Sequence, residues 1–213
     1  MCARSPSALP GIIAPEVERE LPGLRLRHLT LARSGGRDRP DAAGRLRVLS
    51  DRLRGSSAVA LRTTPVAHAY RAFFRQVGLD PDANPIPAER AAIARLRDGT
   101  LRSAAPVADA CLAALVETGV PVWALDAQVV DGATLGIRLA DLSRLEDPWG
   151  VHAPAGTLVV ADAAAVRARL FEDPPRRGTA GAASRDIALF SVGVPGVSEL
   201  HIDEALWCAS ELV

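Results

Sequence analysis

The most informative absence in this chain of 213 residues is lysine, because all 25 of its basic residues are arginine. Schiff-base chemistry on lysine, the lysine of a phosphate-binding loop and a lysine general base are therefore excluded. Aromatic residues are also scarce at 4%, which argues against a platform that stacks single-stranded bases. The pair Gly35-Gly36 lacks the spacing of a dinucleotide fingerprint, and we expect no cofactor.

Net charge is absent as well, since 25 acidic residues balance the basic ones. No overall field attracts nucleic acid or an anionic membrane, although a local arginine patch stays open. Three widely spaced cysteines (Cys2, Cys111 and Cys208) fit a reducing cytoplasm better than a disulfide framework. The four histidines form no close pair, so no metal site is predicted.

Long apolar runs are missing too. No stretch approaches 18 uninterrupted apolar residues, and the apolar run at the N-terminus is too short for a signal peptide. We therefore expect a soluble cytoplasmic protein with no membrane partner. Its arginine- and alanine-rich composition suggests a GC-rich bacterial genome.

Hydrophobic periodicity predicts helices mainly in the first half of the chain and strands mainly in the second. The expected helices lie near 46–53, 65–77, 88–97, 107–118 and 202–212, and the expected strands at 24–31, 120–125, 134–139, 157–161, 166–171 and 187–192. This order is typical of α+β layering rather than of βαβ repeats. We expect an N-terminal tail over 1–14 and a single domain over 15–213.

Three segments between these elements are rich in turn residues. A polar loop is expected at 33–44, and the segment 80–87, DPDANPIP, predicts an ordered loop or a linker. The segment 172–184, EDPPRRGTAGAAS, combines small residues with paired arginines. It is either a plain solvated loop or a loop that covers a site, and the residues leave both open.

Few residues suggest catalysis. His68, on an expected helix, is a candidate for proton transfer near neutral pH, and a partly buried structural histidine is the alternative. Arg71, Arg75 and Arg95 belong to a group of seven arginines between residues 62 and 102. They are candidates for contacts with RNA phosphates, and solvated helix faces are the alternative.

An ordered set of residues follows in the segment 101–126. It consists of Arg102, Asp109, Gly119, Pro121 and Asp126. After this segment come an arginine–x–alanine strand at 137–140 and the sequence LVVAD at 158–162. Before it, within 69–89, lies an expected helix with paired aromatic residues, followed by Gly-Leu-Asp-Pro. With this order and spacing, the chain resembles the B3/B4 tRNA-binding domain family of the phenylalanyl-tRNA synthetase beta subunit, most closely its free-standing bacterial members.

The resemblance implies a B3/B4-like fold with a mixed sheet, flanking helices and a central pocket. In the synthetase, that pocket hydrolyses tyrosine mischarged onto the phenylalanine tRNA. The resemblance places the following residues at the pocket: Arg102, Asp109, Cys111, Leu112, Trp123, Asp126 and Arg138. Arg102, Asp109, Asp126 and Arg138 would form its frame, and Leu112 and Trp123 its apolar wall. For Asp109 and Arg138 the alternative is a buried ion pair or strand-end hydrogen bonding that only supports the fold.

The wall departs from the family pattern. Leu112 stands at an asparagine position, Trp123 at a histidine position and Cys111 where threonine is usual. The glycine–glutamate pair expected soon after Ala140 is also absent. A large apolar wall can bind a side chain, yet it lacks the polar groups that orient a water or hold an ester carbonyl.

Two functions therefore stay open. In the first, the protein binds tRNA or aminoacyl-tRNA and hydrolyses the mischarged ester in trans as a deacylase, without synthetase activity of its own. In the second, it is a non-catalytic module that binds an amino acid or another small metabolite. Arginines that form a continuous stripe beside the pocket favour the first, and scattered arginines favour the second.

Overall fold

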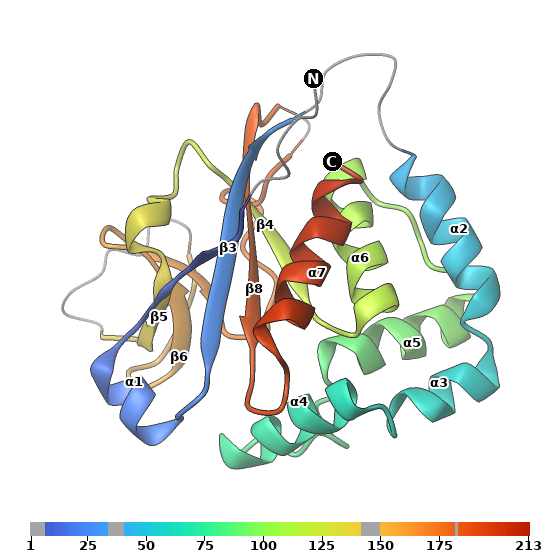
Figure 1. Ribbon diagram of the computed structural model, residues 1–213, viewed down its shortest axis with the longest axis horizontal. Helices are drawn as coiled ribbons and strands as arrows, with labels where there is room; N and C mark the ends of the chain where they lie inside the picture. The colour runs from blue at the N-terminus through green and yellow to red at the C-terminus, as the bar shows by residue number, and fades with distance from the viewer. Residues whose placement is uncertain (1–6, 34–40, 142–149, 182) are drawn as a thin grey trace.

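The computed structural model describes residues 7–33, 41–141, 150–181 and 183–213, with the backbone alone at 57–59. Within these ranges the chain forms helices and two four-stranded sheets, which confirms the expected α+β class. Most helices lie on one side of the first sheet, and the second sheet lies on its other side (Figure 1). Residues 1–6 of the expected tail, 34–40 of the expected loop, 142–149 and 182 lie outside the described residues.

The first sheet is antiparallel throughout, in the order β1-β3-β8-β4. Its strands are β1 (Leu9–Pro10), β3 (Arg25–Ala32), β8 (Asp186–Gly193) and β4 (Val122–Asp126). Strand β8 is buried at seven successive residues, as expected for a strand covered on both faces. In the register, Phe190 of β8 lies between His28 and Trp123.

The second sheet has the order β2-β5-β6-β7. It consists of β2 (Ile12–Ile13), β5 (Gly136–Leu139), β6 (Leu158–Ala161) and β7 (Val166–Arg169). Strand β2 runs parallel to β5 and the other pairs are antiparallel, so a mixed sheet is present as expected. The short 3₁₀ helix η1 (Gly132–Thr134) precedes β5.

Proline and glycine mark the helix ends. The helices are α1 (Pro15–Glu20), α2 (Ala42–Arg52), α3 (Gly55–Leu61), α4 (Pro65–Gln76), α5 (Pro87–Asp98), α6 (Pro106–Thr118) and α7 (Glu199–Ser210). Four of them begin with proline, whose missing N–H costs nothing in the first turn. Helices α5 and α6 end at Gly99 and Gly119, both with a φ of 76°, a conformation that glycine adopts without strain.

The expected N-terminal tail is wrong for residues 9–13. These residues pair first with β3 and then with β5, so they cross from one sheet to the other. The crossing is tight at Gly11, where a Cβ would lie 2.9 Å from the carbonyl oxygen of Leu135. Packing against two sheets therefore orders a segment too short to show any periodicity.

An aromatic cluster joins the helices to both sheets. The buried ring of Phe171, which follows β7, lies with its centroid 5.8 Å from Tyr70, 5.2 Å from Phe74 and 6.3 Å from Trp123. Phe171 has a φ of 62°, a strained left-handed conformation for a side chain of this size. The Tyr70 hydroxyl donates to the Val192 carbonyl at 2.7 Å, which anchors α4 to β8.

Candidate functional site

A cavity of about 610 Å³ lies between α5, α6, strand β4 and the loop at 172–181. We name it the Trp123 cavity. Three of the predicted pocket residues, Cys111, Leu112 and Trp123, line it together. Helix α6 supplies the first two and β4 the third, so sequence positions 11 or 12 residues apart meet because α6 folds back onto the sheet.

Trp123 is a rigid part of this wall. Its side chain is 7% exposed and its ring stacks on Phe190, with centroids 5.4 Å apart and planes 20° apart. Its indole Nε1 donates a hydrogen bond to Oδ1 of Asp173 at 3.2 Å. Stacking and hydrogen bonding together fix the orientation of the indole, and this order favours binding of a ligand with a defined shape.

Cys111 is not an activated nucleophile. Burial, with a smaller contribution from the negative charge of Asp173, raises the pKa of its thiol to about 12. The thiol therefore stays protonated near neutral pH, and a protonated thiol is a poor nucleophile. Cys111 contributes a small apolar surface to the cavity.

The loop at 172–181 forms the outer wall of the Trp123 cavity. It extends the edge of β4, because Asp126 N donates to the Gly178 carbonyl at 3.0 Å and Ala180 N donates to the Ala124 carbonyl at 3.2 Å. Asp173 and Thr179 of this loop line the cavity. The sequence left open whether this segment is a plain solvated loop or a loop that covers a site, and its position agrees with the second alternative.

Arg90 is a cavity residue that the sequence did not single out. It lines the Trp123 cavity from α5, and its Nη2 donates to the carbonyl oxygen of Phe171 at 2.7 Å. Within the part of the chain that the structure describes, no carboxylate lies within ion-pair distance of Arg90. In the sequence, Arg90 was marked only as one of the seven arginines between residues 62 and 102.

The expected pocket frame is not formed by its four predicted residues, none of which lines the Trp123 cavity. Arg102 is exposed and pairs with Asp98 at 3.1 Å. Asp109 is buried near the start of α6, where it accepts hydrogen bonds from Ala104 N at 2.8 Å and from the Ser103 hydroxyl at 2.5 Å. It thus stabilises the turn into the helix.

The other two frame residues serve the fold as well. Asp126 accepts hydrogen bonds from Gln128 N at 2.9 Å and from the Ser184 hydroxyl at 2.6 Å, which holds the end of the covering loop. Arg138 reaches the Thr134 carbonyl at 3.4 Å, within the second sheet and its preceding turn. The contacts of Asp109 and Arg138 agree with the alternative, in which these residues only support the fold.

His68 is an exposed residue of α4 and lines neither this cavity nor the larger one described below. The partly buried alternative is therefore wrong for His68. Proton transfer by His68 stays a prediction, and neither of these two cavities supports it.

The three arginines predicted to contact RNA differ in their surroundings. Arg71 is 8% exposed and binds Glu89 at 2.8 Å and Asp82 at 2.7 Å, so it is committed to an ion-pair network inside the protein. This corrects its prediction as an RNA contact. Arg95 is half-buried and donates to the Ser50 carbonyl at 3.0 Å, whereas Arg75 is exposed on α4.

In the described ranges, no cluster of histidine, cysteine, aspartate and glutamate side chains has the arrangement to hold a metal ion. The helices within those ranges include none that is long and apolar enough to span a membrane. No protein-family model matches the chain, and no curated protein matches it either. The resemblance to the B3/B4 family therefore stays a prediction.

Proposed function

We propose that this protein is a binding module for an amino acid or another small metabolite, and that the Trp123 cavity is its site. The apolar wall of Leu112 and Trp123 suits a hydrophobic side chain. Arg90 and Asp173 add one positive and one negative group to the lining. A zwitterionic ligand would place its carboxylate on Arg90 and its ammonium group on Asp173.

Binding without hydrolysis is supported by the chemistry of the lining. Cys111 is protonated near neutral pH because of its raised pKa, and the Asp173 carboxylate already accepts from the Trp123 indole. Among the described residues that line this cavity there is no histidine. The observation that carries the proposal is this combination of an ordered apolar wall with neither a histidine nor an ionised thiol among the described lining residues. A cytoplasmic location is part of the proposal, and the free thiols of Cys111 and Cys208 support it.

The proposal is tested by thermal-shift and calorimetric screening of amino acids and stable aminoacyl analogues. A ligand at about 100 times its Kd adds about 2.7 kcal/mol to the free energy of unfolding, so the Tm rises by several degrees. Ala108, an exposed residue of α6 that lines the cavity, allows the cavity to be filled by Ala108→Trp. We expect this variant to lose the ligand-induced rise in Tm.

Ala72→Trp is the matched control, because Ala72 is exposed on α4 and lies outside this cavity. It should keep the full ligand response. Flat melting curves across the whole panel, or equal responses from the two variants, would contradict the proposal.

A second candidate function is binding and deacylation of mischarged aminoacyl-tRNA. It is favoured by Arg176 and Arg177, which are exposed on the loop that covers the Trp123 cavity. Phosphate contacts from these residues would make tRNA affinity fall steeply with salt. One test incubates the protein with a panel of mischarged tRNAs and measures deacylation. A second test compares the tRNA affinity of the double variant Arg176→Gln/Arg177→Gln with that of the control variant Arg19→Gln on α1. Deacylation no faster than in buffer, with equal tRNA binding by both variants, rejects this candidate.

A further inference from the structure

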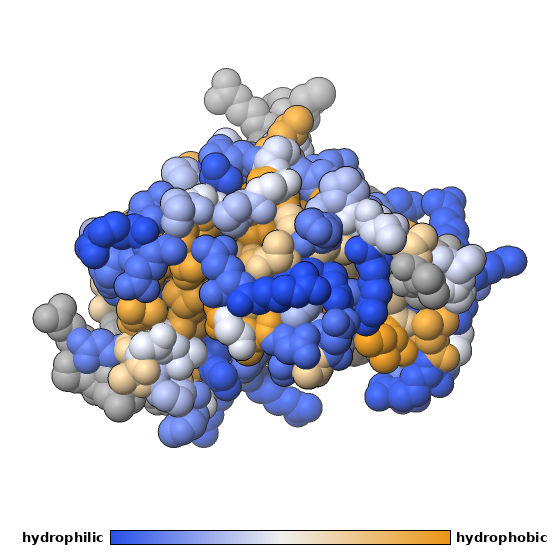
Figure 2. All heavy atoms as spheres, turned by 90° about the horizontal axis from the view of Figure 1, so that it is seen from below, coloured by the Kyte–Doolittle hydropathy of each residue, from blue (hydrophilic) through white to orange (hydrophobic). Residues whose placement is uncertain are grey.

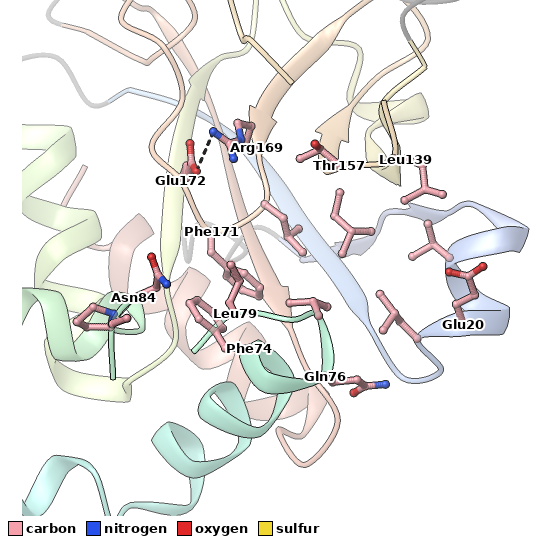
Figure 3. A pocket seen from close by; sticks show the side chains of 18 of the residues that line it. Glu20, Phe74, Gln76, Leu79, Asn84, Leu139, Thr157, Arg169, Phe171 and Glu172 are labelled. Atoms are coloured by element: carbon pink, nitrogen blue, oxygen red, sulfur yellow. Dashed lines mark ion pairs between the residues drawn. The ribbon is translucent and has the colours of Figure 1, made fainter. Parts of the chain in front are cut away.

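A second and larger cavity, of about 710 Å³, lies beyond Phe171. We name it the Phe74 cavity. It is bounded by α1, the C-terminal end of α4, the turn at 79–85 and the ends of β5, β6 and β7. Figure 3 shows Asn84 at one end and Glu20 of α1 at the other, with Phe74 and Phe171 between them. From below, hydrophobic side chains are visible in a hollow between hydrophilic ones (Figure 2).

The inner surface of this cavity is mostly apolar. Its apolar lining residues include Val17, Leu21, Phe74, Val77, Leu158 and Phe171. The volume falls in the range of small-molecule sites, which is about 300–1,000 Å³. Leu79, at the cavity, is 41% exposed, so an apolar ligand would remove from water a hydrophobic surface that the fold leaves open.

The charged groups around the cavity are not equivalent. Arg169 and Glu172 are paired with each other at 3.3 Å on the rim and are both half-exposed (Figure 3). Arg90 lines this cavity as well as the Trp123 cavity, and its bond to the Phe171 carbonyl holds the guanidinium beside an apolar wall. That bond uses Nη2, which leaves the N–H groups of Nε and Nη1 for an anion.

We propose that the Phe74 cavity is a second ligand site and that it takes a hydrophobic carboxylate such as a medium-chain fatty acid. The carboxylate binds Arg90, and the chain runs over Phe74 and Val77 toward Val17 of α1. Arg90 is exposed, but its hydrogen bond to the Phe171 carbonyl already restricts the guanidinium, so less side-chain entropy remains to be lost when an anion binds. Glu20 at the far end is exposed, so it stays hydrated and does not select a buried cation.

Calorimetry with decanoate, decanol and decylamine tests this assignment, because the three share one chain and differ in charge. Decanoate should bind at least tenfold more tightly than either of the others. Arg90→Gln should reduce decanoate affinity about tenfold, as expected for one charge-assisted hydrogen bond. Arg75→Gln, at an exposed arginine of α4 that lines neither cavity, should leave the affinity unchanged.

Two aspartate variants locate the chain of the ligand. Leu79→Asp places a negative charge at the cavity and should abolish decanoate binding, whereas Leu200→Asp, at a residue 69% exposed on α7, should not. Ala108→Trp, which fills the Trp123 cavity, should also leave decanoate binding intact, so this proposal and the proposed function can fail separately. The proposal is overturned if decanoate binds no more tightly than decanol, or if Leu79→Asp binds it normally while its melting curve shows a folded protein.

Discussion

Arginines that look alike in the sequence differ in what their guanidinium groups contact. Arg71 is buried in a network in which Arg62 also contacts Glu89 and Asp82, at 3.3 and 3.4 Å. Arg90 instead bonds to a carbonyl oxygen beside two cavities. The partners decide the role of each arginine: paired guanidinium groups stabilise the fold, and a guanidinium held without a carboxylate can bind an anion.

The buried network predicts a stability effect at Arg71. Replacing it by methionine leaves the Glu89 carboxylate, 3% exposed, without its closest cation. We expect Arg71→Met to lower the free energy of unfolding by about 3 kcal/mol, the lower end for buried pairs because Asp82 is exposed. Arg71→Met/Glu89→Gln should lose less, since no buried charge is left unpaired.

Urea denaturation measures both variants. Arg75→Met is the control on the same helix, and its exposure predicts a change within about 0.5 kcal/mol. An equal effect of Arg71→Met and Arg75→Met would show that the network adds nothing to stability.

His28 predicts a pH dependence of stability. It is 4% exposed on β3, and its Nδ1 has no hydrogen-bond partner among the described residues. Burial, and secondarily the charge of Arg27, lower the pKa of His28 below its usual 6.5. As the pH falls, the unfolded chain therefore takes up a proton that the folded protein does not. The titration of His28 has no effect on the free energy of unfolding well above pH 6.5, and the free energy of unfolding decreases as the pH falls through 6.5 and below.

The measurement is the free energy of unfolding between pH 8 and pH 5, a window of about 1.5 units on either side of the usual histidine pKa. His28→Gln should show a shallower decline than the natural sequence, because its side chain does not titrate. Parallel curves for the two proteins would contradict the assignment to His28.

Local sequence signals locate some helices closely, but they do not locate the shortest strands. Proline at the first turn and glycine just past the last turn mark α5 and α6 closely, as predicted near 88–97 and 107–118. Strands β1 and β2 have two residues each, too few for any periodic pattern, and were missed. They exist because β3 and β5 offer hydrogen-bonding edges to residues 9–13.

The pairing of β2 with β5 depends on Gly136. A Cβ at this position would lie 2.1 Å from the carbonyl oxygen of Ile12, a backbone atom that cannot move without displacing β2. We expect Gly136→Ala to lower the free energy of unfolding by about 1–3 kcal/mol, as overpacking does elsewhere. Gly55→Ala, with no heavy atom within 4 Å of the added Cβ, should be neutral or slightly stabilising in urea denaturation. Equal stabilities would show that β2 contributes little.

The largest of three clusters of buried apolar residues links the helices to both sheets. It contains Val17 of α1, Phe73 of α4, Ala110 of α6, Val160 of β6 and Leu189 of β8. Phe171 lies in this core, lines the Phe74 cavity and contacts Trp123, which lines the Trp123 cavity. The two proposed sites therefore share Arg90 and are linked by this aromatic contact, while their other lining residues differ.

Because this large cluster spans both sheets, we expect a single cooperative unfolding transition, as for one domain. Scanning calorimetry should give equal calorimetric and van't Hoff enthalpies, and far-UV circular dichroism and tryptophan fluorescence should melt together. Two separated transitions would instead indicate that the sheets unfold independently.

Three lining residues of the candidate site were predicted together, but the extent of the site was not. Cys111, Leu112 and Trp123 were predicted together and meet in one cavity. Asp109 and Asp126 were predicted beside them from their spacing, yet they hold a helix start and a loop end. Aspartate is favoured at such ends whether or not a pocket is near, so the residue type could not distinguish the two roles.

Local patterns were enough to predict the α+β class and the ends of α4, α5 and α6, because periodicity and helix-end residues are local properties, and the composition alone excludes lysine chemistry. Which arginine is buried, which one lies at the cavities and what holds Trp123 became clear only from the folded chain. Those outcomes depend on pairs such as Arg71–Glu89, Trp123–Asp173 and Arg90–Phe171, which are 18, 50 and 81 residues apart. Contacts over such separations follow from packing of the whole chain, which no local pattern encodes.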